Sequence, residues 1–329
     1  MKGICIGVPG GEDHPVFLRV IEEGLAKHGF DTLVLLIRYA FPFKSHPGVA
    51  EPNCLTATQF RDIALACRRT GIRLIPKMNL MGHQSGKDRG TEAGLLRAYP
   101  HFDETPDLDS VRYCRSLCPR HPEVLPVVCD LIDEMIDLFE ADAFHVGCDE
   151  VFEIGHCPRC RNVPHAELFA DWIVGLYDHI VGRRKAEMLM WADRLLDAAT
   201  TGYGEWEASM NATHPAVDLI PSDIICCDWH YTVREDYPSV PFLTGKGFRT
   251  VVCPWRNVEA TNALLAYAGT VRSEKLSGVL QTSWCDSGDL SRAILGEAPF
   301  GAATSGAAAN EVAFEVADSM RAVSASALR

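Results

Sequence analysis

Eight short apolar runs recur along the chain, and helical patterns separate most of them. The runs are rich in Ile, Val, Leu and Cys, as is typical of parallel strands that are covered on both faces. They comprise residues 4–8, 33–37, 72–76, 143–147, 188–191, 224–228, 250–253 and 278–282. Eight strands that alternate with helices predict an α/β fold, a single (β/α)8 TIM barrel. A doubly wound open sheet is the alternative, but no G-x-G-x-x-G follows the first strand.

Helical periodicity fills most of the intervals between these runs. Amphipathic helices are expected at residues 15–28, 58–69, from 122 onward, 166–181, 259–272, 290–295 and around 310–323. Two connections, at residues 77–120 and 192–222, are long enough to be functional. Because 329 residues suit one barrel, residues 1–329 are predicted to form a single domain, with a C-terminal helix and tail at 302–329.

The composition argues against several kinds of partner. The net charge is −13 and no basic cluster is present, so we expect no nucleic-acid binding. No apolar run approaches the roughly 20 residues that span a bilayer, so we expect no membrane association. The apolar N-terminal stretch is too short for a signal peptide, and thirteen cysteines then favour reduced thiols and a cytoplasmic location. The sequence leaves the oligomeric state open, a homodimer included.

The fourth apolar run is followed by two adjacent carboxylates, Asp149 and Glu150. Neighbouring side chains on a continuing strand point to opposite faces, so these two can share a site only where the backbone turns. Gly147 marks such a turn. Two carboxyl groups buried together raise the pKa of one of them, which is how a general acid is made. The alternative is a solvated turn in which Asp149 only caps a helix.

Polar and aromatic residues also follow the other predicted strands. In a barrel of this kind the active site lies at the C-terminal ends of the strands, so these residues are expected at one rim. They are Arg38, Tyr39, Lys77, Asn79, His83, Trp191, Asp193, Asp228, Trp229, His230, Tyr231, Trp255, Arg256, Trp284 and Asp286. Four of the six tryptophans belong to this set. Aromatic faces stack on pyranose rings, which predicts a sugar pocket and a carbohydrate partner, unless the tryptophans merely cover the barrel end.

The stretch from His145 to Glu150, H-V-G-C-D-E, resembles the H-x-G-G-D-E signature of family 20 glycoside hydrolases, the β-N-acetylhexosaminidases. Residues 75–83, I-P-K-M-N-L-M-G-H, are similar to the family's I-P-E-x-x-x-P-G-H stretch, and M-L-M-W-A-D, D-W-H-Y and T-S-W-C-D are similar to its tryptophan-bearing strand ends. The likeness covers nearly the whole chain, although only the strand-four motif is specific. The family's arginine after the first strand and its H-x-x-D after the second are missing, which leaves the particular sugar open.

The resemblance implies a glycoside hydrolase catalytic domain that removes β-linked GlcNAc or GalNAc by substrate-assisted retaining hydrolysis. Glu150 would be the general acid/base, and Asp149 would orient the 2-acetamido group. Tyr231 is the candidate for a second hydrogen bond to that group. The predicted substrate-binding residues are Arg38, His83, His145, Trp191, Trp229, Tyr231, Trp255, Trp284 and Asp286. No cofactor is implied.

Two rival functions remain. One is a metal-dependent barrel, an isomerase or amidohydrolase, with His83, Asp149, Glu150, Asp228 and His230 as ligands. The other is a non-catalytic carbohydrate-binding barrel, although the intact Asp-Glu pair speaks against it. A chelator would abolish activity only under the first of these.

A C-x-x-C motif, Cys157 and Cys160, follows the Asp-Glu pair. One such motif supplies half of a zinc site, and Cys114, Cys118 or His156 could supply the rest. Free or locally packed thiols are the favoured prediction, with a small structural zinc as the alternative. Catalysis itself is predicted to need no metal.

Overall fold

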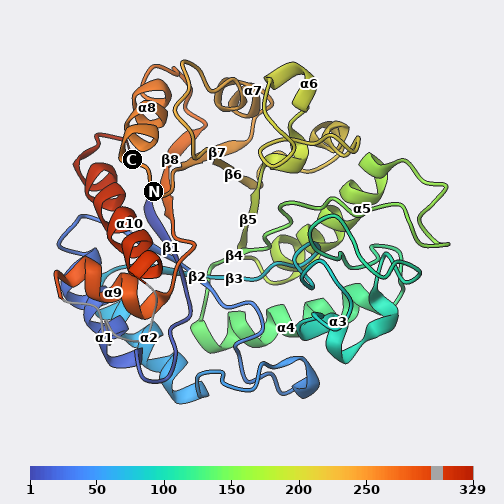
Figure 1. Cartoon of the computed structure of the whole chain (residues 1–329), viewed down its shortest axis with the longest axis horizontal. Coiled ribbons are helices and arrows are strands. Elements are labelled where there is room, and N and C mark those ends of the chain that lie inside the picture. Colours follow the sequence, from blue (N-terminus) through green and yellow to red (C-terminus); the bar gives the residue numbers. More distant parts are fainter. Residues whose placement is uncertain (298–306, 329) are drawn as a thin grey trace.

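Eight parallel strands close into a barrel in the computed structural model, which describes residues 1–297 and 307–328 (Figure 1). The strands are β1 (Lys2–Gly7), β2 (Thr32–Leu36), β3 (Arg73–Lys77), β4 (Ala143–His145), β5 (Glu187–Trp191), β6 (Ile225–Trp229), β7 (Arg249–Cys253) and β8 (Leu276–Thr282). Each strand pairs with the next, and β8 pairs with β1. The predicted TIM barrel is confirmed, and every strand end lies within two residues of its expected position. The largest difference that affects the site is β4, which stops at His145 because the backbone turns there.

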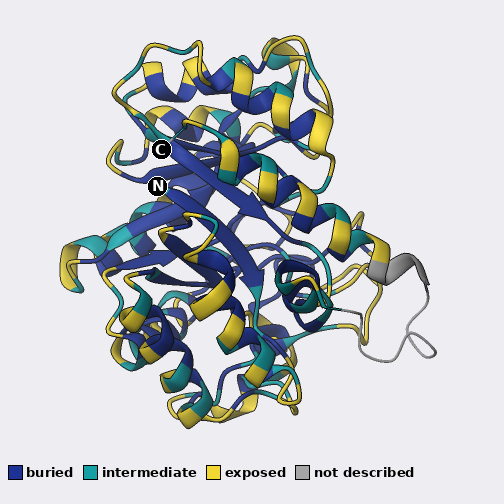
Figure 2. Cartoon of the chain, turned by 90° about the vertical axis from the view of Figure 1, so that its left-hand side faces the viewer, coloured by how far each residue is buried: buried dark blue, intermediate teal, exposed yellow. Residues whose placement is uncertain are grey.

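Helices surround the barrel, and their exposed faces point outward while the strands are buried (Figure 2). The α-helices are α1 (His14–Arg19), α2 (Ala57–Thr70), α3 (Gly94–Ala98), α4 (Val124–Phe139), α5 (His165–Tyr177), α6 (Ala198–Thr201), α7 (Ser239–Gly245), α8 (Val258–Ala268), α9 (Ser287–Leu295) and α10 (Ala307–Ala325). Two π-helical turns, η1 (Val20–Leu25) and η4 (Asp178–Arg183), extend α1 and α5; short 3₁₀ turns are η2 (Pro47–Val49), η3 (Pro100–Phe102), η5 (Asp193–Leu195) and η6 (His214–Asp218). The sequence pattern did not predict α7, whose short span contains Pro241.

Side-chain alternation along the strands divides the core into two layers. In β1, Ile4 and Ile6 pack outward against the helices, whereas Cys5 points into the barrel. Cys5 joins an inner cluster that includes Val34, Ile75, Leu189, Ile225, Val251 and Leu280 from the other strands. The interior is therefore filled by side chains, and an open site can form only at a barrel end.

Local signals set the ends of the helices. Thr56 and Gln59 form a reciprocal capping box that begins α2, and Gly71 ends it with a left-handed backbone (φ 71°). These caps satisfy backbone groups that the first and last helical turns leave without partners. The helix that follows β2 is therefore fixed at both ends by sequence-local chemistry.

Helix α10 closes the outer layer beside the chain's N-terminus by packing against α8 and α9 (Figure 1). Its Ser319 hydroxyl donates to Gln281 of β8 (3.0 Å) and lies 2.8 Å from the hydroxyl of Thr261 in α8. This confirms the helix expected around residues 310–323, whereas residues 302–306 and 329 of the predicted tail lie outside the described residues. Across residues 1–297 and 307–328, no helix has both the length and the apolar character needed to cross a bilayer.

Candidate active site

The turn after β4 brings Asp149 and Glu150 to the same cavity. The backbone angle φ is positive at Gly147 (69°), Cys148 (64°) and Glu150 (51°), so the chain leaves the strand direction at once. A Cβ on Gly147 would lie 2.8 Å from the carbonyl oxygen of Met78, so only glycine fits there without displacing the neighbouring backbone. Two adjacent carboxylates can therefore converge, as the sequence predicted.

Asp193, which follows β5, fixes the backbone of this turn. Its Oδ2 accepts a hydrogen bond from the N–H of Glu150 (2.9 Å) and another from Nε of Arg194 (2.7 Å). Burial raises the pKa of Asp193 to about 6, because the opposing charge of Arg194 offsets the desolvation only in part. The side chain of Asp193, just after β5, thus positions Glu150 by binding the main-chain N–H of Glu150.

His83 bridges the two carboxylates. Its Nε2 lies 3.2 Å from Oδ2 of Asp149 and 3.2 Å from Oε2 of Glu150. Burial alone would lower the pKa of His83, but the charges and hydrogen bonds of Asp149 and Glu150 raise it to about 9. His83 is therefore a cation at neutral pH and compensates part of the negative charge of the pair.

Asp149 is an ionised acceptor with a free oxygen. Burial alone would raise the pKa of this carboxyl, but His83 and then Lys77 outweigh burial and hold the pKa well below its usual range. The Oδ1 atom is buried and has no hydrogen-bond partner among the residues that the structure describes. A buried acceptor without a partner is costly, so this oxygen is suited to an N–H donor on a ligand.

Lys77 ends β3 beneath the aromatic wall, where the sequence resemblance expects an acid. It is fully buried, and its Nζ donates to Oδ1 of Asn79 (2.7 Å). The ammonium lies 5.3 Å from the ring centre of Trp191 and 5.9 Å from that of Trp284. Burial lowers the pKa of Lys77, and the charge of Asp149 opposes that shift. Lys77 is in turn one of the groups that lower the pKa of Asp149.

Aromatic residues from three strand ends make the wall. Trp191 and Trp284 meet edge to face with ring centres 6.0 Å apart, and the rings of Trp229 and Tyr231 lie 5.0 Å apart. The indole N–H of Trp284 donates to the hydroxyl of Tyr231 (2.8 Å). An indole N–H can only donate, so the hydroxyl of Tyr231 uses a lone pair here and keeps its proton for another acceptor.

The cavity between these groups has a volume of about 550 Å³. It is lined by Arg38, Asn79, His83, Tyr113, Asp149, Glu150, Trp191, Gly204, Trp206, Glu207, Trp229, Tyr231, Thr232, Arg234 and Trp284. A second cavity of about 600 Å³ shares Arg38, Asn79, His83 and Trp284 with it and extends toward Gly7 and Tyr39. Both predicted catalytic residues and six of the predicted substrate-binding residues thus share one space.

Three predicted substrate-binding residues line neither cavity. His145 is fully buried behind Trp191, with ring centres 4.6 Å apart, and its Nδ1 accepts from the N–H of Gly147 (3.0 Å). Trp255 lies outside the wall, next to Tyr231 at 5.3 Å between ring centres. Asp286 caps α9 by accepting from the N–H of Asp289. These three residues therefore pack behind the cavity wall or cap a helix, and none of them faces the cavity.

Loops add lining residues that the strand ends did not reveal. Tyr113, from the β3–α4 connection, and Trp206, from the β5–β6 connection, meet with ring centres 5.0 Å apart. Both are about two-fifths exposed, so they form the outer edge of the cavity. Glu207 and Arg234, which also line this cavity, form an ion pair with one another. For Tyr113, Trp206 and Glu207 the only sequence signal was the unusual length of the two connections, and Arg234, which lies between β6 and α7, had no such signal.

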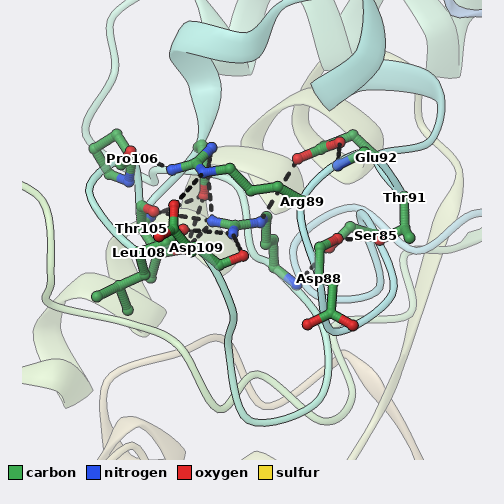
Figure 3. A network of polar contacts seen from close by, with 12 residues as sticks. Ser85, Asp88, Arg89, Thr91, Glu92, Thr105, Pro106, Leu108 and Asp109 are labelled. Atoms are coloured by element: carbon green, nitrogen blue, oxygen red, sulfur yellow. Dashed lines mark hydrogen bonds and ion pairs between the residues drawn. The ribbon is translucent and has the colours of Figure 1, made fainter.

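The β3–α4 connection is held in place by a buried arginine. Arg115 is fully buried, and its Nη1 donates to Asp103 (2.8 Å) and to the carbonyl oxygen of Thr105 (2.9 Å). Arg89 lies in the same network, where it pairs with Asp103 and donates to the carbonyl oxygen of Pro106 (Figure 3). The network explains how a connection with little regular structure can present Tyr113 to the cavity in a defined position.

Metal-binding groups also meet in the cavity. One ligand atom each of His83, Asp149 and Glu150 lies within 4.8 Å of the other two. Asp228 and His230, the other ligands considered for a metal-dependent barrel, do not join them. His230 instead bonds Asp228 (3.1 Å), and its other ring nitrogen lies 3.2 Å from Glu207 of the cavity lining. The five residues of the rival metal-barrel hypothesis therefore do not form one centre.

Solved structures share the architecture. The chain resembles the Flavobacterium johnsoniae chitobiase with a TM-score of 0.66 and 15% identity, covering 98% of this chain and 51% of that one. A family 20 exo-β-N-acetylglucosaminidase from Vibrio harveyi, solved with N-acetylglucosamine, gives a TM-score of 0.61 and 16% identity, covering 96% of this chain and 54% of that one. At such low identity these likenesses bear on the fold alone.

Curated relatives are similar over shorter stretches. A β-hexosaminidase from Akkermansia muciniphila is 29% identical over 122 residues, which cover 35% of this chain and 23% of that protein. Hexosaminidase D from Bos taurus is 26% identical over 174 residues, which cover 50% of this chain and 47% of that protein. The matched stretches thus span less than half of either relative. Residues 38–263, more than half of the chain, match the catalytic domain of glycosyl hydrolase family 20, and the chain belongs to that family.

Proposed function

We propose that this chain is a glycosidase that removes β-linked N-acetylhexosamine by substrate-assisted retaining hydrolysis. The observation that carries this proposal is the meeting of Asp149 and Glu150 at His83 in a tryptophan-walled cavity. In this mechanism the substrate's own 2-acetamido oxygen replaces an enzyme nucleophile. Two carboxyl groups and a pocket that holds the sugar are then sufficient for the chemistry.

Glu150 is the proposed general acid/base. It lines the cavity, its backbone is held by Asp193, and its side chain is about 15% exposed, so a bound glycoside could reach it. Its proton passes to the glycosidic oxygen as the bond to the anomeric carbon breaks. In the second step the same carboxylate takes a proton from the water that opens the intermediate.

Asp149 and Tyr231 are the proposed partners of the acetamido group. The unpaired Oδ1 of Asp149 would accept the acetamido N–H, and its negative charge would stabilise the oxazolinium-like intermediate. The hydroxyl of Tyr231, already an acceptor for Trp284, would donate to the acetamido oxygen. Burial raises the pKa of Tyr231 well above its ordinary value, so the hydroxyl keeps its proton throughout the neutral range.

A panel of chromogenic sugars, each with and without a 2-acetamido group, tests the reaction. We expect GlcNAc or GalNAc β-glycosides to be cleaved far faster than their 2-hydroxy counterparts, and a thiazoline mimic of the intermediate to inhibit tightly. Equal cleavage of both series, together with indifference to the thiazoline, would contradict substrate assistance. Loss of turnover in chelator, restored by a divalent metal, would favour the metal-dependent alternative.

Two substitutions separate the proposed roles. Glu150→Gln should lower turnover by roughly 10²–10⁴-fold, least for substrates with good leaving groups, because they need little proton donation. Asp149→Asn should impair acetamido substrates specifically. Single-turnover rates across leaving groups of graded acidity provide the measurement, and an Asp149→Asn effect equal for all sugars would contradict its assigned role.

We also propose a cytoplasmic location. All thirteen cysteines are free of disulfides, which supports a reducing compartment. Fractionation of the native host with an antibody to the chain tests this, and recovery mainly in the secreted fraction would contradict it.

A further inference from the structure

Four buried ligand groups converge beside the catalytic turn, outside the cavity. They are the thiols of Cys118, Cys157 and Cys160 and the carboxylate of Glu104, each with a ligand atom within 4.8 Å of the others. All four residues are at most 2% exposed. The sulfur of Cys118 lies 3.4 Å from that of Cys157 and 3.7 Å from that of Cys160. Two thiolates bound to one tetrahedral zinc at about 2.3 Å lie about 3.8 Å apart, so the observed spacing is close to that geometry.

Glu104 provides an independent sign of a ligand. Its Oε1 accepts hydrogen bonds from the N–H groups of Gly155 (2.9 Å) and His156 (3.0 Å). Its Oε2 is buried and has no hydrogen-bond partner among the residues that the structure describes. A carboxylate oxygen buried without a partner is strongly unfavourable, and a cation at the centre of the thiols would satisfy it.

We propose that Cys118, Cys157, Cys160 and Glu104 bind one zinc ion in a closed, structural site. Thiolate sulfur selects zinc over magnesium or calcium, and four protein ligands leave no open position for catalysis. Binding releases the three thiol protons to solvent.

The site would join two segments that are far apart in the sequence. Glu104 and Cys118 belong to the β3–α4 connection, whereas Cys157 and Cys160 follow Glu150 by seven and ten residues. The ion would therefore fasten the loop that leaves the catalytic turn to the loop that carries Tyr113. The other candidate ligands from the sequence are engaged elsewhere: Cys114 accepts from the N–H of His83, and His156 pairs with Glu153.

Metal analysis of the full chain, purified without chelator, tests the proposal directly. We expect close to one zinc per chain. Cys118→Ser and Cys157→Ser should lose the metal, whereas Cys67→Ala should retain it, because Cys67 is equally buried but lies in α2, away from the cluster. Glu104→Gln keeps the size of the side chain while removing its charge, so it should release zinc to a chelator faster than the wild type.

Cobalt substitution of the wild-type chain provides a readout that does not depend on variant folding. Stripped protein that takes up Co²⁺ should show the intense visible bands of a tetrahedral site together with sulfur-to-metal charge-transfer absorption. A folded chain with all thiols reduced that contains no zinc and binds no Co²⁺ would overturn the proposal. So would a Cys118–Cys157 disulfide found by non-reducing peptide mapping, because a disulfide would consume two of the ligands.

Discussion

The imidazole of His83 holds together the carboxyl groups of Asp149 and Glu150, the two proposed catalytic residues. The folded protein raises the pKa of His83 to about 9, whereas an unfolded chain leaves it near 6.5. Its contribution to stability is therefore complete below pH 6.5 and is lost as the pH rises through 9. The shift corresponds to on the order of 3 kcal/mol of unfolding free energy.

Denaturant unfolding at pH 6 and pH 9.5 measures this contribution. We expect the wild type to lose more stability between the two values than His83→Gln, which can still donate a hydrogen bond but cannot carry the charge. His28 is a control: burial, Arg321 and Lys27 lower its pKa, so His28→Gln should not reduce the alkaline loss. An equal loss in wild type and His83→Gln would show that the bridge does not depend on its charge.

The aromatic wall makes a second prediction at this scale. Trp284 lines both cavities, whereas Trp255 lines neither, although the sequence favoured both as sugar-binding residues. Trp284→Ala should raise KM or the Kd of a substrate analogue about thirtyfold, the equivalent of about 2 kcal/mol. Trp255→Ala should leave binding nearly unchanged and lower stability instead. Calorimetric titration with a substrate analogue, alongside thermal unfolding, distinguishes the two variants. Equal losses of binding affinity in both variants would show that Trp255 also contacts the sugar.

Strand ends explain which site residues the sequence could predict. Trp191 and Trp229 are the last residues of β5 and β6, and Trp284 lies two residues after β8, so the geometry of a parallel barrel brings all three to one rim. Tyr113 and Trp206 reach the same cavity from loops whose path depends on distant contacts, such as those of Arg115. No periodicity encodes such a path, so the outer edge of the site could not be inferred.

At the scale of elements, the turn after β4 depends on one glycine. Gly147→Ala would impose a positive φ on alanine and place its Cβ 2.8 Å from the carbonyl oxygen of Met78. Gly29 is a matched control, because its φ is 71° but a Cβ there would meet nothing within 4 Å. We expect Gly29→Ala to cost about 1 kcal/mol of stability from backbone strain alone.

Gly147→Ala should cost more stability than Gly29→Ala and should also lower kcat, because the turn positions both carboxylates. Chemical denaturation and steady-state kinetics on the two variants give the comparison. If the two glycines respond alike in stability and kcat is retained, the close approach to Met78 is not what fixes the turn.

The elements that the sequence predicted are those with strong local signals. The strands are near-continuous runs of β-branched and aliphatic residues, and α2 carries both a capping box and a terminal glycine. Helix α7 has neither a long apolar stripe nor a side-chain cap, and Pro241 lies within it. Its position is set by packing on β6 and β7, a tertiary effect that local patterns do not record.

At the scale of the whole molecule, the pairing of the first and last strands is covered by α10, which lines neither cavity. The first strand, β1, pairs with the last strand, β8, and this pairing closes the barrel. Helix α10 covers the region by packing against β8, α8 and α9. Met320 of α10 is 1% exposed, whereas Phe314 of the same helix is 41% exposed. The helix should therefore contribute to stability through one face only.

Met320→Ala tests this division between scaffold and site. The substitution should lower the free energy of unfolding by about 2–5 kcal/mol, because it leaves a cavity under α10, whereas Phe314→Ala should change it by less than about 1 kcal/mol. KM and kcat, measured well below the unfolding transition, should stay at wild-type values in both variants, because neither side chain lines the cavities. A large change in KM for folded Met320→Ala would mean that the seam of the barrel is coupled to the sugar pocket. In that case α10 would influence sugar binding as well as the stability of the barrel.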